Sequence, residues 1–316
     1  MNSEANDPTT FTGLAALALG ASPSVRRSTS KFIDTIRDFV GLGFEPNRIR
    51  AMAAAEADAK IIAAEADVLV QKIKQDGRLN LQISRADARA RMDQERQQLN
   101  IESIVQAAAG QLPDDASESP VNSDWTAQFF EHCKNISDKD MQALWSQILS
   151  GEVVAPGAFS LRTLSLVRLL SKEEANLFTR FCSTVWFMGD KFDPLVYSPS
   201  EKGEEVNEIV TFEELLHLDS IGLIKIHATG LSFGPNEEDV WIYFKKIHRI
   251  TSTAKTVNKG LPVGVAVFTE AGRQLAALAG VVPNEEYRKS VVKRLRALGW
   301  KVDDHIPWPD DADLSS

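Results

Sequence analysis

The side chains best suited to chemistry in this sequence are basic ones near its C-terminal end. Residues 240–302 contain twelve Lys or Arg against three Glu, in a chain whose formal net charge is −9. Dense positive charge attracts phosphates and carboxylates. We therefore predict contact with an acidic protein partner, with nucleic acid or with the chain's own acidic parts, and an ordinary solvated face is the alternative. Apart from Arg273, these cations fall into two stretches, Lys245, Lys246, Arg249, Lys255 and Lys259 in the first and Arg288, Lys289, Lys293, Arg294, Arg296 and Lys301 in the second.

Motifs of known enzymes are missing from the sequence. No G-x-x-x-x-G-K-[ST], G-x-S-x-G or H-E-x-x-H pattern occurs, and the five His residues are dispersed. Cys133 follows His132 directly on an expected helix, where sequence neighbours point in different directions. Cys182 lies among aromatic residues, as a core residue does. We therefore predict no catalytic residue, no metal and no cofactor, while a site built from distant carboxylates stays open.

The helix that would read a DNA groove is acidic. Residues 212–220 include Glu213, Glu214 and Asp219 but no Lys or Arg. Three carboxylates repel phosphates and release no counterions. Any contact with nucleic acid would therefore be non-specific and would use the two basic stretches.

The elements around the basic stretches predict a winged-helix-like α+β module over residues 206–302. Apolar and β-branched runs at 223–226, 240–244 and 263–268 favour strands of one small antiparallel sheet. Thr211, Thr269 and Asn284 are typical N-caps of the helices between and after these strands.

A helical domain is expected over residues 121–205. Ser123, Ser137 and Ser171 precede apolar periodic segments, each with an acid close behind, which is typical of helix starts. Gly151 is expected to end the second helix, and the third is expected to run through Phe187.

A long helical arm is predicted over residues 45–112. The segment 47–109 has no Pro and a single Gly, Gly77, and its 51–67 part is rich in Ala, the best helix former. Two structures are possible for this arm. It forms either one unbroken helix in a coiled coil with other copies, or a hairpin bent near Gly77. Because an Ala-rich helix has little bulky apolar surface, we expect the protein to form homo-oligomers.

The two ends of the chain are expected to be polar extensions. Residues 1–44 are predicted to form a flexible N-terminus with a short amphipathic helix at 31–41, and this helix could lie on a membrane surface. Residues 303–316 form an acidic tail. No basic secretory signal and no long apolar span is evident, so a cytoplasmic protein is expected.

The middle of the chain resembles a bacterial family catalogued as the domain of unknown function number twenty-eight hundred and six. The blocks 135–152 and 156–164 are similar to its core signature, and 100–105 and 218–224 to further family features, over roughly residues 45–300. The resemblance implies no activity and no catalytic residue. Within these blocks we predict structural roles for Asp138, Asp140, Trp145 and Arg162, with Trp145 in the core and Arg162 in an ion pair that holds the 156–160 turn.

These features together favour a mainly α, non-enzymatic interaction or scaffold protein. The arm would oligomerise, and the C-terminal module would dock a protein partner. Modular families of this kind also occur in phage-defence or mobile-element loci, which is an analogy only. Two alternatives stay open: a sequence-nonspecific nucleic-acid binder using 245–259 and 288–301, and a membrane-associated effector using the N-terminal amphipathic segment.

Overall fold

The computed structural model describes residues 77–112, 120–188, 191–197, 209–234, 236–244, 246–303 and 306–307. Two compact units divide the chain, Met1–Leu164 and Ser165–Ser316. This division differs from the domain boundary expected at residues 205 and 206. The expected amphipathic helix at 31–41, the Ala-rich run at 51–67 and the tail beyond 307 lie outside the described residues, as does Lys245.

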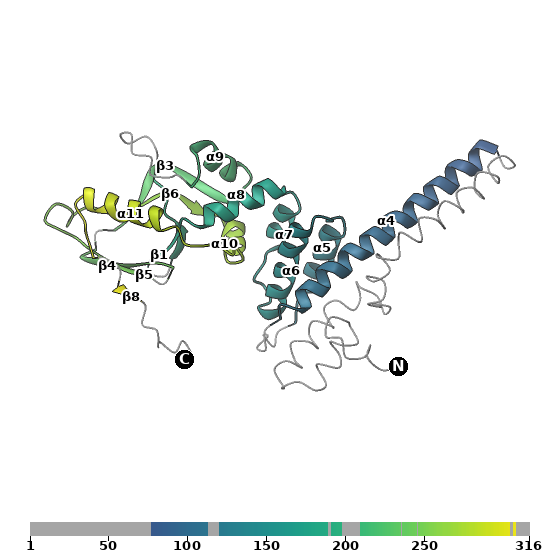
Figure 1. Cartoon of the computed structure of the whole chain (residues 1–316), viewed down its shortest axis with the longest axis horizontal. Helices are drawn as coiled ribbons and strands as arrows, with labels where there is room; N and C mark the ends of the chain where they lie inside the picture. The colour runs from purple at the N-terminus through teal and green to yellow at the C-terminus, as the bar shows by residue number, and fades with distance from the viewer. Residues whose placement is uncertain are drawn as a thin grey trace, which may run out of the picture. The chain divides into compact units, whose positions relative to one another are not determined.

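The first unit consists of helices in its described part. Its members are α4 (Gly77–Ala109), α5 (Ser123–Cys133) and α6 (Lys139–Val154), while α7 (Leu161–Val167) spans the division between the units (Figure 1). Helix α4 packs along α6, and its buried positions follow helical spacing, which places one apolar stripe toward the core. These positions are Ile101, Ile104, Val105 and Ala108.

A polar seam also joins α4 to α6. The Gln142 carboxamide donates to Asn100 Oδ1 at 3.1 Å and accepts from the Ser103 hydroxyl at 2.9 Å. Gln142 and Asn100 are both buried. Because buried polar groups are costly unless hydrogen-bonded, these bonds fix the register of the two helices.

The starts of α5 and α6 differ slightly from the prediction. Asn122, not Ser123, caps α5 by accepting from the N–H groups of Asp124 and Trp125. Asp138, not Ser137, caps α6 by accepting from the N–H groups of Asp140 and Met141. Asn and Asp are at least as favourable at N-caps as Ser, so where two candidates are adjacent the composition does not choose between them.

The predicted helix end at Gly151 is wrong. Helix α6 continues through Gly151 to Val154. A Cβ at residue 151 would lie 2.8 Å from the Phe159 ring. Gly151 is therefore explained by the close packing of Phe159 on α6 and not by helix termination.

The second unit is an α+β assembly with two antiparallel sheets. The larger sheet has the strand order β2-β1-β4-β5-β7, with β8 also on β5, and the smaller is the pair β3-β6. In chain order the elements are α8 (Lys172–Cys182), β1 (Val185–Met188), β2 (Lys191–Pro194), α9 (Phe212–Ser220), β3 (Ile224–Phe233), β4 (Glu238–Tyr243), β5 (Lys246–Thr251), β6 (Leu261–Phe268), α10 (Glu270–Ala276), α11 (Glu285–Ala297), β7 (Lys301–Val302) and β8 (Ile306–Pro307).

Two strand predictions in this unit need correction. The three predicted strands do not share one sheet, because β3 pairs with β6 whereas β4 pairs with β1 and β5. The helix expected to reach Phe187 ends at Cys182 instead, and residues 185–188 form β1. Aromatic and β-branched side chains at Val185, Trp186 and Phe187 suit a strand once a pairing partner is present.

Helix α11 lies between the two sheets of this unit. Its buried residues include Tyr287, Val291 and Leu295, and the Tyr287 ring lies 5.8 Å from that of Tyr243 on β4. On its other side, Arg294 lines a pocket together with residues of β3 and β6. The helix therefore joins both sheets into one core.

The predicted caps in the second unit are confirmed. Ser171 and Thr211 each form a complete capping box with a Glu three residues later. Thr269 and Asn284 cap α10 and α11. In the part of the chain that the structure covers, no helix is both long and apolar enough to cross a bilayer.

Candidate functional site

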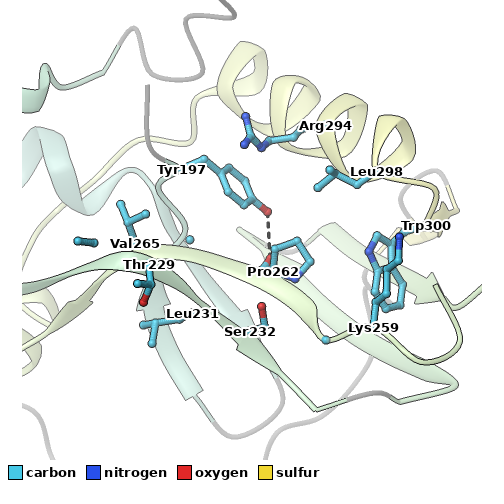
Figure 2. A pocket seen from close by; sticks show the side chains of 14 residues that line it. Tyr197, Thr229, Leu231, Ser232, Lys259, Pro262, Val265, Arg294, Leu298 and Trp300 are labelled. Atoms are coloured by element: carbon cyan, nitrogen blue, oxygen red, sulfur yellow. Dashed lines mark hydrogen bonds between the residues drawn. The ribbon is translucent and has the colours of Figure 1, made fainter. Parts of the chain in front are cut away.

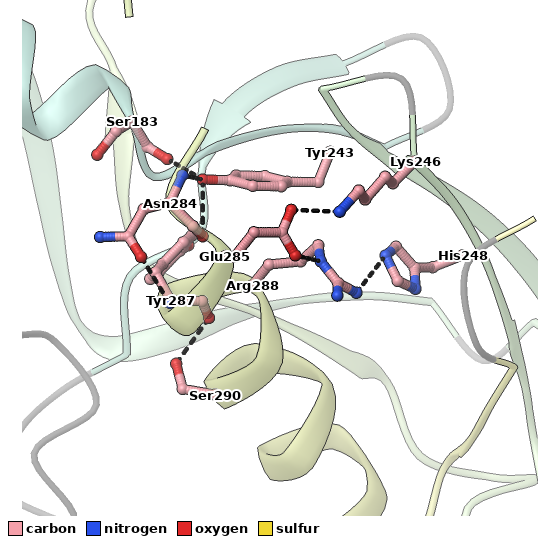
Figure 3. A network of polar contacts seen from close by, with 9 residues as sticks. All are labelled: Ser183, Tyr243, Lys246, His248, Asn284, Glu285, Tyr287, Arg288 and Ser290. Carbon is pink, nitrogen blue, oxygen red and sulfur yellow. Dashed lines mark hydrogen bonds and ion pairs between the residues drawn. The ribbon is translucent and has the colours of Figure 1, made fainter. Parts of the chain in front are cut away.

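Two of the predicted basic residues belong to an internal polar network. On α11, Glu285 accepts from Lys246 of β5 through one carboxylate oxygen and from Arg288 Nε, at 3.0 Å, through the other (Figure 3). Arg288 is buried, and its Nη1 lies 3.4 Å from His248 Nε2. Since a guanidinium can only donate, this geometry makes Nε2 of His248 the acceptor. Lys246 and Arg288 therefore hold α11 on the sheet and are unsuited to binding a phosphate backbone.

The electrostatics of Glu285 follow from this network. The hydrogen bond from Lys246, supported by Arg288, holds the pKa of the Glu285 carboxyl below its ordinary value. Both partners of the Lys246 contact are partly open to solvent, so screening limits what the pair contributes to stability. Nearby, burial raises the pKa of Tyr243 to about 12, and its hydroxyl donates to the Ser183 carbonyl at 2.9 Å.

Glu285→Gln is expected to make the protein less stable at neutral pH but not in acid. A carboxyl whose pKa is lowered on folding contributes stability that is present above its unfolded pKa and is lost as the pH falls through the folded pKa. We expect the variant to lose about 1 kcal/mol at pH 7, after allowance for solvent screening, and almost nothing below the folded pKa. Urea unfolding at several pH values measures both.

Glu286→Gln is the matched control for this prediction. Glu286 is the exposed neighbour in the same first turn of α11, so it experiences the same helix dipole. If both variants lose equal stability at pH 7, the dipole and not the network accounts for the effect.

The remaining predicted cations differ in their accessibility. Arg249 pairs with Glu238 at 3.1 Å across the β4–β5 hairpin. The Arg294 guanidinium carbon lies 4.4 Å from the centre of the Tyr197 ring, in a cation–π contact. The other six described members of the two stretches are exposed. Arg296 donates to the Val302 carbonyl at 2.7 Å, and Lys301 lies 3.7 Å from an Asp303 carboxylate oxygen. The remaining four are Lys255, Lys259, Lys289 and Lys293.

The structure brings the two basic stretches together at one pocket. Its volume is about 350 Å³, and it opens between α11 and the β3–β6 sheet (Figure 2). Lys259 from the first stretch and Arg294 from the second line it, together with the hydroxyl-bearing Thr229 and Ser232. No Asp or Glu is among the described lining residues. We call this cavity the basic pocket.

Sequence reasoning missed the aromatic part of the basic pocket. Tyr197 and Trp300 line it together with Leu298, and the Tyr197 hydroxyl donates to the Pro262 carbonyl at 3.1 Å. Tyr197 precedes α11 by some ninety residues in the sequence, so no local pattern connects the two. Only the position of Trp300, within the second basic stretch and next to Lys301, offered a signal.

The residues of the family blocks have structural surroundings in the first unit. Trp145 is fully buried and Asp138 caps α6. Asp140 lies in the first turn of α6, where a carboxylate favours the positive helix end. Arg162 is exposed, and no ion pair with Asp138, Asp140 or Glu152 is found among the described residues.

Glu152 is the residue that holds the turn which Arg162 was expected to hold. Its carboxylate accepts from the N–H groups of Gly157 at 2.6 Å and Phe159 at 2.9 Å. Burial raises the pKa of Glu152, while these two hydrogen bonds oppose the shift. In addition, the Trp125 indole donates to the Phe159 carbonyl at 2.7 Å. Packing and hydrogen bonding thus account for Trp145, Glu152 and Phe159 of this block.

Metal and thiol chemistry find no support in the described parts of the chain. Among those residues no group of three or more His, Cys, Asp or Glu is placed to hold a metal ion. Cys133 and Cys182 are buried, and burial raises the pKa of both thiols. A buried thiol that stays protonated is a poor nucleophile.

The described residues define an α+β protein with a helical first unit and a basic pocket in its second unit. The chain belongs to the family described as "Protein of unknown function (DUF2806)", whose model matches residues 84–292. This match covers more than half of the sequence and confirms the resemblance noted above. Nothing among the curated proteins, and nothing among the solved structures, matches the chain.

Proposed function

We propose that this chain is a non-enzymatic interaction protein that docks a partner protein through the second unit and forms oligomers through α4. The docking part rests on one observation, an apolar row that crosses the larger sheet. In register, Phe192 of β2 lies opposite Phe187 of β1, and Phe187 lies opposite Ile242 of β4. Ile242 in turn lies opposite Ile247 of β5.

Directly paired residues share a face of a sheet, so these four side chains form one continuous row. The residues next to them in the strands, among them Trp186 and Trp241, point to the other face and are buried. In contrast, Phe187 is 50% exposed, and Val240 beside the row is 45% exposed. The other members of the row, Phe192, Ile242 and Ile247, are partly exposed. Apolar side chains grouped at a surface mark interaction sites.

The finer assignment of a winged-helix-like module remains part of this proposal. It is supported by the order of an acid-rich helix α9, strand β3 and strand β6, with β3 and β6 paired as in a wing. The β4–β5 hairpin stands between these strands in the sequence and joins the larger sheet instead. The apolar row belongs to this inserted hairpin and to β1–β2.

The docking proposal predicts that a Phe187→Ser, Val240→Ser double variant loses a protein that the wild type retains. Affinity capture from cells that express the gene would compare the two. Leu169→Ser is the control, because Leu169 is an isolated apolar side chain that is 79% exposed. If the double variant and the control retain the same proteins as the wild type, the row is not a docking surface.

The oligomerisation part rests on the exposed half of α4. Residues 85–96 are all exposed, so this stretch of helix is not buried against the other residues that the structure describes. Positions 79, 83, 86 and 90 are spaced four, three and four apart and are occupied by Leu, Ile, Ala and Ala. That is the spacing of a coiled-coil seam, and small Ala residues allow helices to approach closely.

We expect light scattering at micromolar concentration to give a multiple of the chain mass of 34.8 kDa. Ala86→Lys with Ala90→Lys should shift the mass to that of one chain, since it places charge in the seam while Lys keeps helix propensity. Ala88→Lys is the control, because residues two apart on a helix do not share a face. A wild-type monomer would contradict the proposal.

Nucleic-acid binding is the second candidate, supported by the exposed lysines at 255, 259, 289 and 293. It is weakened by the pairing of Lys246, Arg249 and Arg288 with carboxylates. Such binding would be indifferent to sequence and would fall steeply with salt. The membrane alternative concerns residues outside the described part of the chain.

A further inference from the structure

We infer that the basic pocket binds the Phe212 side chain of a second copy of this chain, with Glu213 of that copy paired to Lys259 beside the pocket. None of these residues belongs to the apolar row or to the α4 seam, so the contact is independent of both proposed interfaces. The contact joins two different surfaces of the second unit. Helix α9 packs on the start of β3, whereas residues 228–232 of β3 line the pocket.

Helix α9 presents two large apolar side chains to solvent. Phe212 is 48% exposed and Leu216 is 47% exposed, and side chains four residues apart lie on the same face of a helix. The inward face of α9 carries Leu215 and Leu218, which are buried. Grouped apolar side chains at a surface mark interaction sites, and aromatic side chains contribute strongly to such contacts. Phe212 and Leu216 therefore form an apolar anchor for a partner.

The basic pocket has the size and the walls that an aromatic ring requires. Trp300, Leu298 and Val265 line it (Figure 2), and Leu298 is 43% exposed. The pocket volume is about 350 Å³, whereas an apolar cavity of roughly 150 Å³ is enough to hold benzene. Entry of the Phe212 ring would also cover Leu298, so both copies would remove apolar surface from water.

One wall of the pocket is fixed before a partner arrives. The Tyr197 hydroxyl donates to the Pro262 carbonyl of β6 at 3.1 Å, and the Val265 N–H donates to the Val196 carbonyl at 2.7 Å. The second contact requires Gly264, because its φ is +96° and a Cβ there would lie 2.5 Å from the Val196 carbonyl oxygen. A preformed pocket lowers the entropy lost on binding.

Charge favours Phe212 over Phe187 as the side chain that enters the pocket. Glu213 follows Phe212 directly and is exposed, as is Lys259, and the described lining of the pocket contains no Asp or Glu. The residues on either side of Phe187 in β1 are Trp and Met, which carry no charge. Opposite charges across a contact select the partner and fix its orientation.

Glu213 is the carboxylate of α9 that is suited to this ion pair. Glu214 pairs with Arg180 at 2.5 Å, and Asp219 lies 3.5 Å from Lys225. No ion pair of Glu213 is found among the described residues. Pairing with a second copy therefore breaks no ion pair that the structure shows for this side chain.

The contact is heterologous, because it joins two different surfaces. A pair of copies still has one free α9 and one free pocket, so further copies add until a ring closes or a filament grows. The contact rests on one anchor and one ion pair, so it is small, and we expect it to form at roughly 0.1 mM and above. The light-scattering result expected at micromolar concentration is therefore unaffected.

Sedimentation velocity between about 10 µM and about 1 mM tests the inference. The Ala86→Lys, Ala90→Lys variant is the background, so that association through α4 does not contribute. We expect its weight-average sedimentation coefficient to rise with concentration. Phe212→Ser, Glu213→Lys and Lys259→Glu should each weaken this association at least about tenfold, since each removes the ring or brings like charges together.

A mixture of the Glu213→Lys and Lys259→Glu variants separates this contact from a general effect of charge. The two variants should associate with each other within about threefold of the background, although neither associates alone. The exchanged charges attract across one contact, and the unaltered surfaces meet across the other. Glu270→Lys is the matched control, because Glu270 is an exposed carboxylate in the first turn of α10. It should change the association less than about twofold.

The inference is overturned if the background variant does not associate up to about 1 mM, or if the mixture does not restore association. It is also overturned if Glu270→Lys weakens the association as much as Glu213→Lys does. Loss of the association in Phe187→Ser would overturn it too, because the apolar row would then be the contact between copies.

Discussion

Trp145→Ala is expected to lower the free energy of unfolding of the first unit by about 3–5 kcal/mol, the range for large aromatic residues in a core. Trp145 is fully buried on α6, and its ring meets Phe129 of α5 edge to face at a centroid distance of 5.3 Å. Because α5 and α6 are also fixed to α4 by buried side chains and the polar seam, the helices cannot move together to fill the cavity. Urea unfolding followed by far-UV circular dichroism measures the loss.

Trp145→Phe separates the cavity from the loss of the indole N–H. Within the described residues the Trp145 Nε1 has no hydrogen-bond partner, so its removal leaves nothing unpaired. Trp145→Phe should therefore cost clearly less than Trp145→Ala. Met92→Ala, at a side chain that is 60% exposed, should stay within about 0.5 kcal/mol of the wild type. Equal losses for all three variants would mean that Trp145 does not support the core.

Features decided within one turn of helix could be predicted from the sequence. The boxes Ser171 to Glu174 and Thr211 to Glu214 were predicted and form as expected, because hydroxyl, backbone and carboxylate all lie within four residues. Membership of the family was also predicted, from a block of specific residues.

Features decided by distant partners could not be predicted. Residues 185–188 look like the end of a helix, but they pair with β2, which follows directly, and with β4, some fifty residues later. The prediction that three strands share one sheet was wrong for the same reason. Strand β3 pairs with β6, and not with β4 or β5, which follow it in the sequence. Pairing is a tertiary choice, and tertiary context overrides local propensity.

The candidate site shows the same limit at the level of charge. Composition located the basic stretches, yet it could not show that Glu285 pairs with Lys246 and Arg288, or that Lys259 and Arg294 line one pocket. The net charge of a chain does not show which acidic residue lies next to each cation. A cation with a structural role and a cation that binds a ligand differ in the residues around them. In this protein those residues come from β5, α11 and the 252–260 loop.

Glu152→Ala is expected to destabilise the first unit by about 1–3 kcal/mol, because it leaves the buried Phe159 N–H without an acceptor, whereas the N–H of the exposed Gly157 can bond to water. Glu152 is 1% exposed, and the Phe159 N–H that it accepts from is buried. Loss of this contact also frees the 155–160 loop, so the Phe159 ring would leave its place against Gly151. Denaturant midpoints and hydrogen exchange at Phe159 would both report the change.

Arg162→Ala is the comparison that decides what the family block does. Arg162 is exposed, and substitution of an exposed side chain usually changes stability by less than about 0.5 kcal/mol. If Glu152→Ala is strongly destabilising and Arg162→Ala is not, the block is a structural element closed by a buried carboxylate. A large loss of stability in Arg162→Ala would instead restore the ion pair expected from the sequence. If Arg162→Ala keeps full stability but abolishes the biological phenotype, Arg162 is a functional residue, because a side chain that supports no packing can only act on something outside the fold.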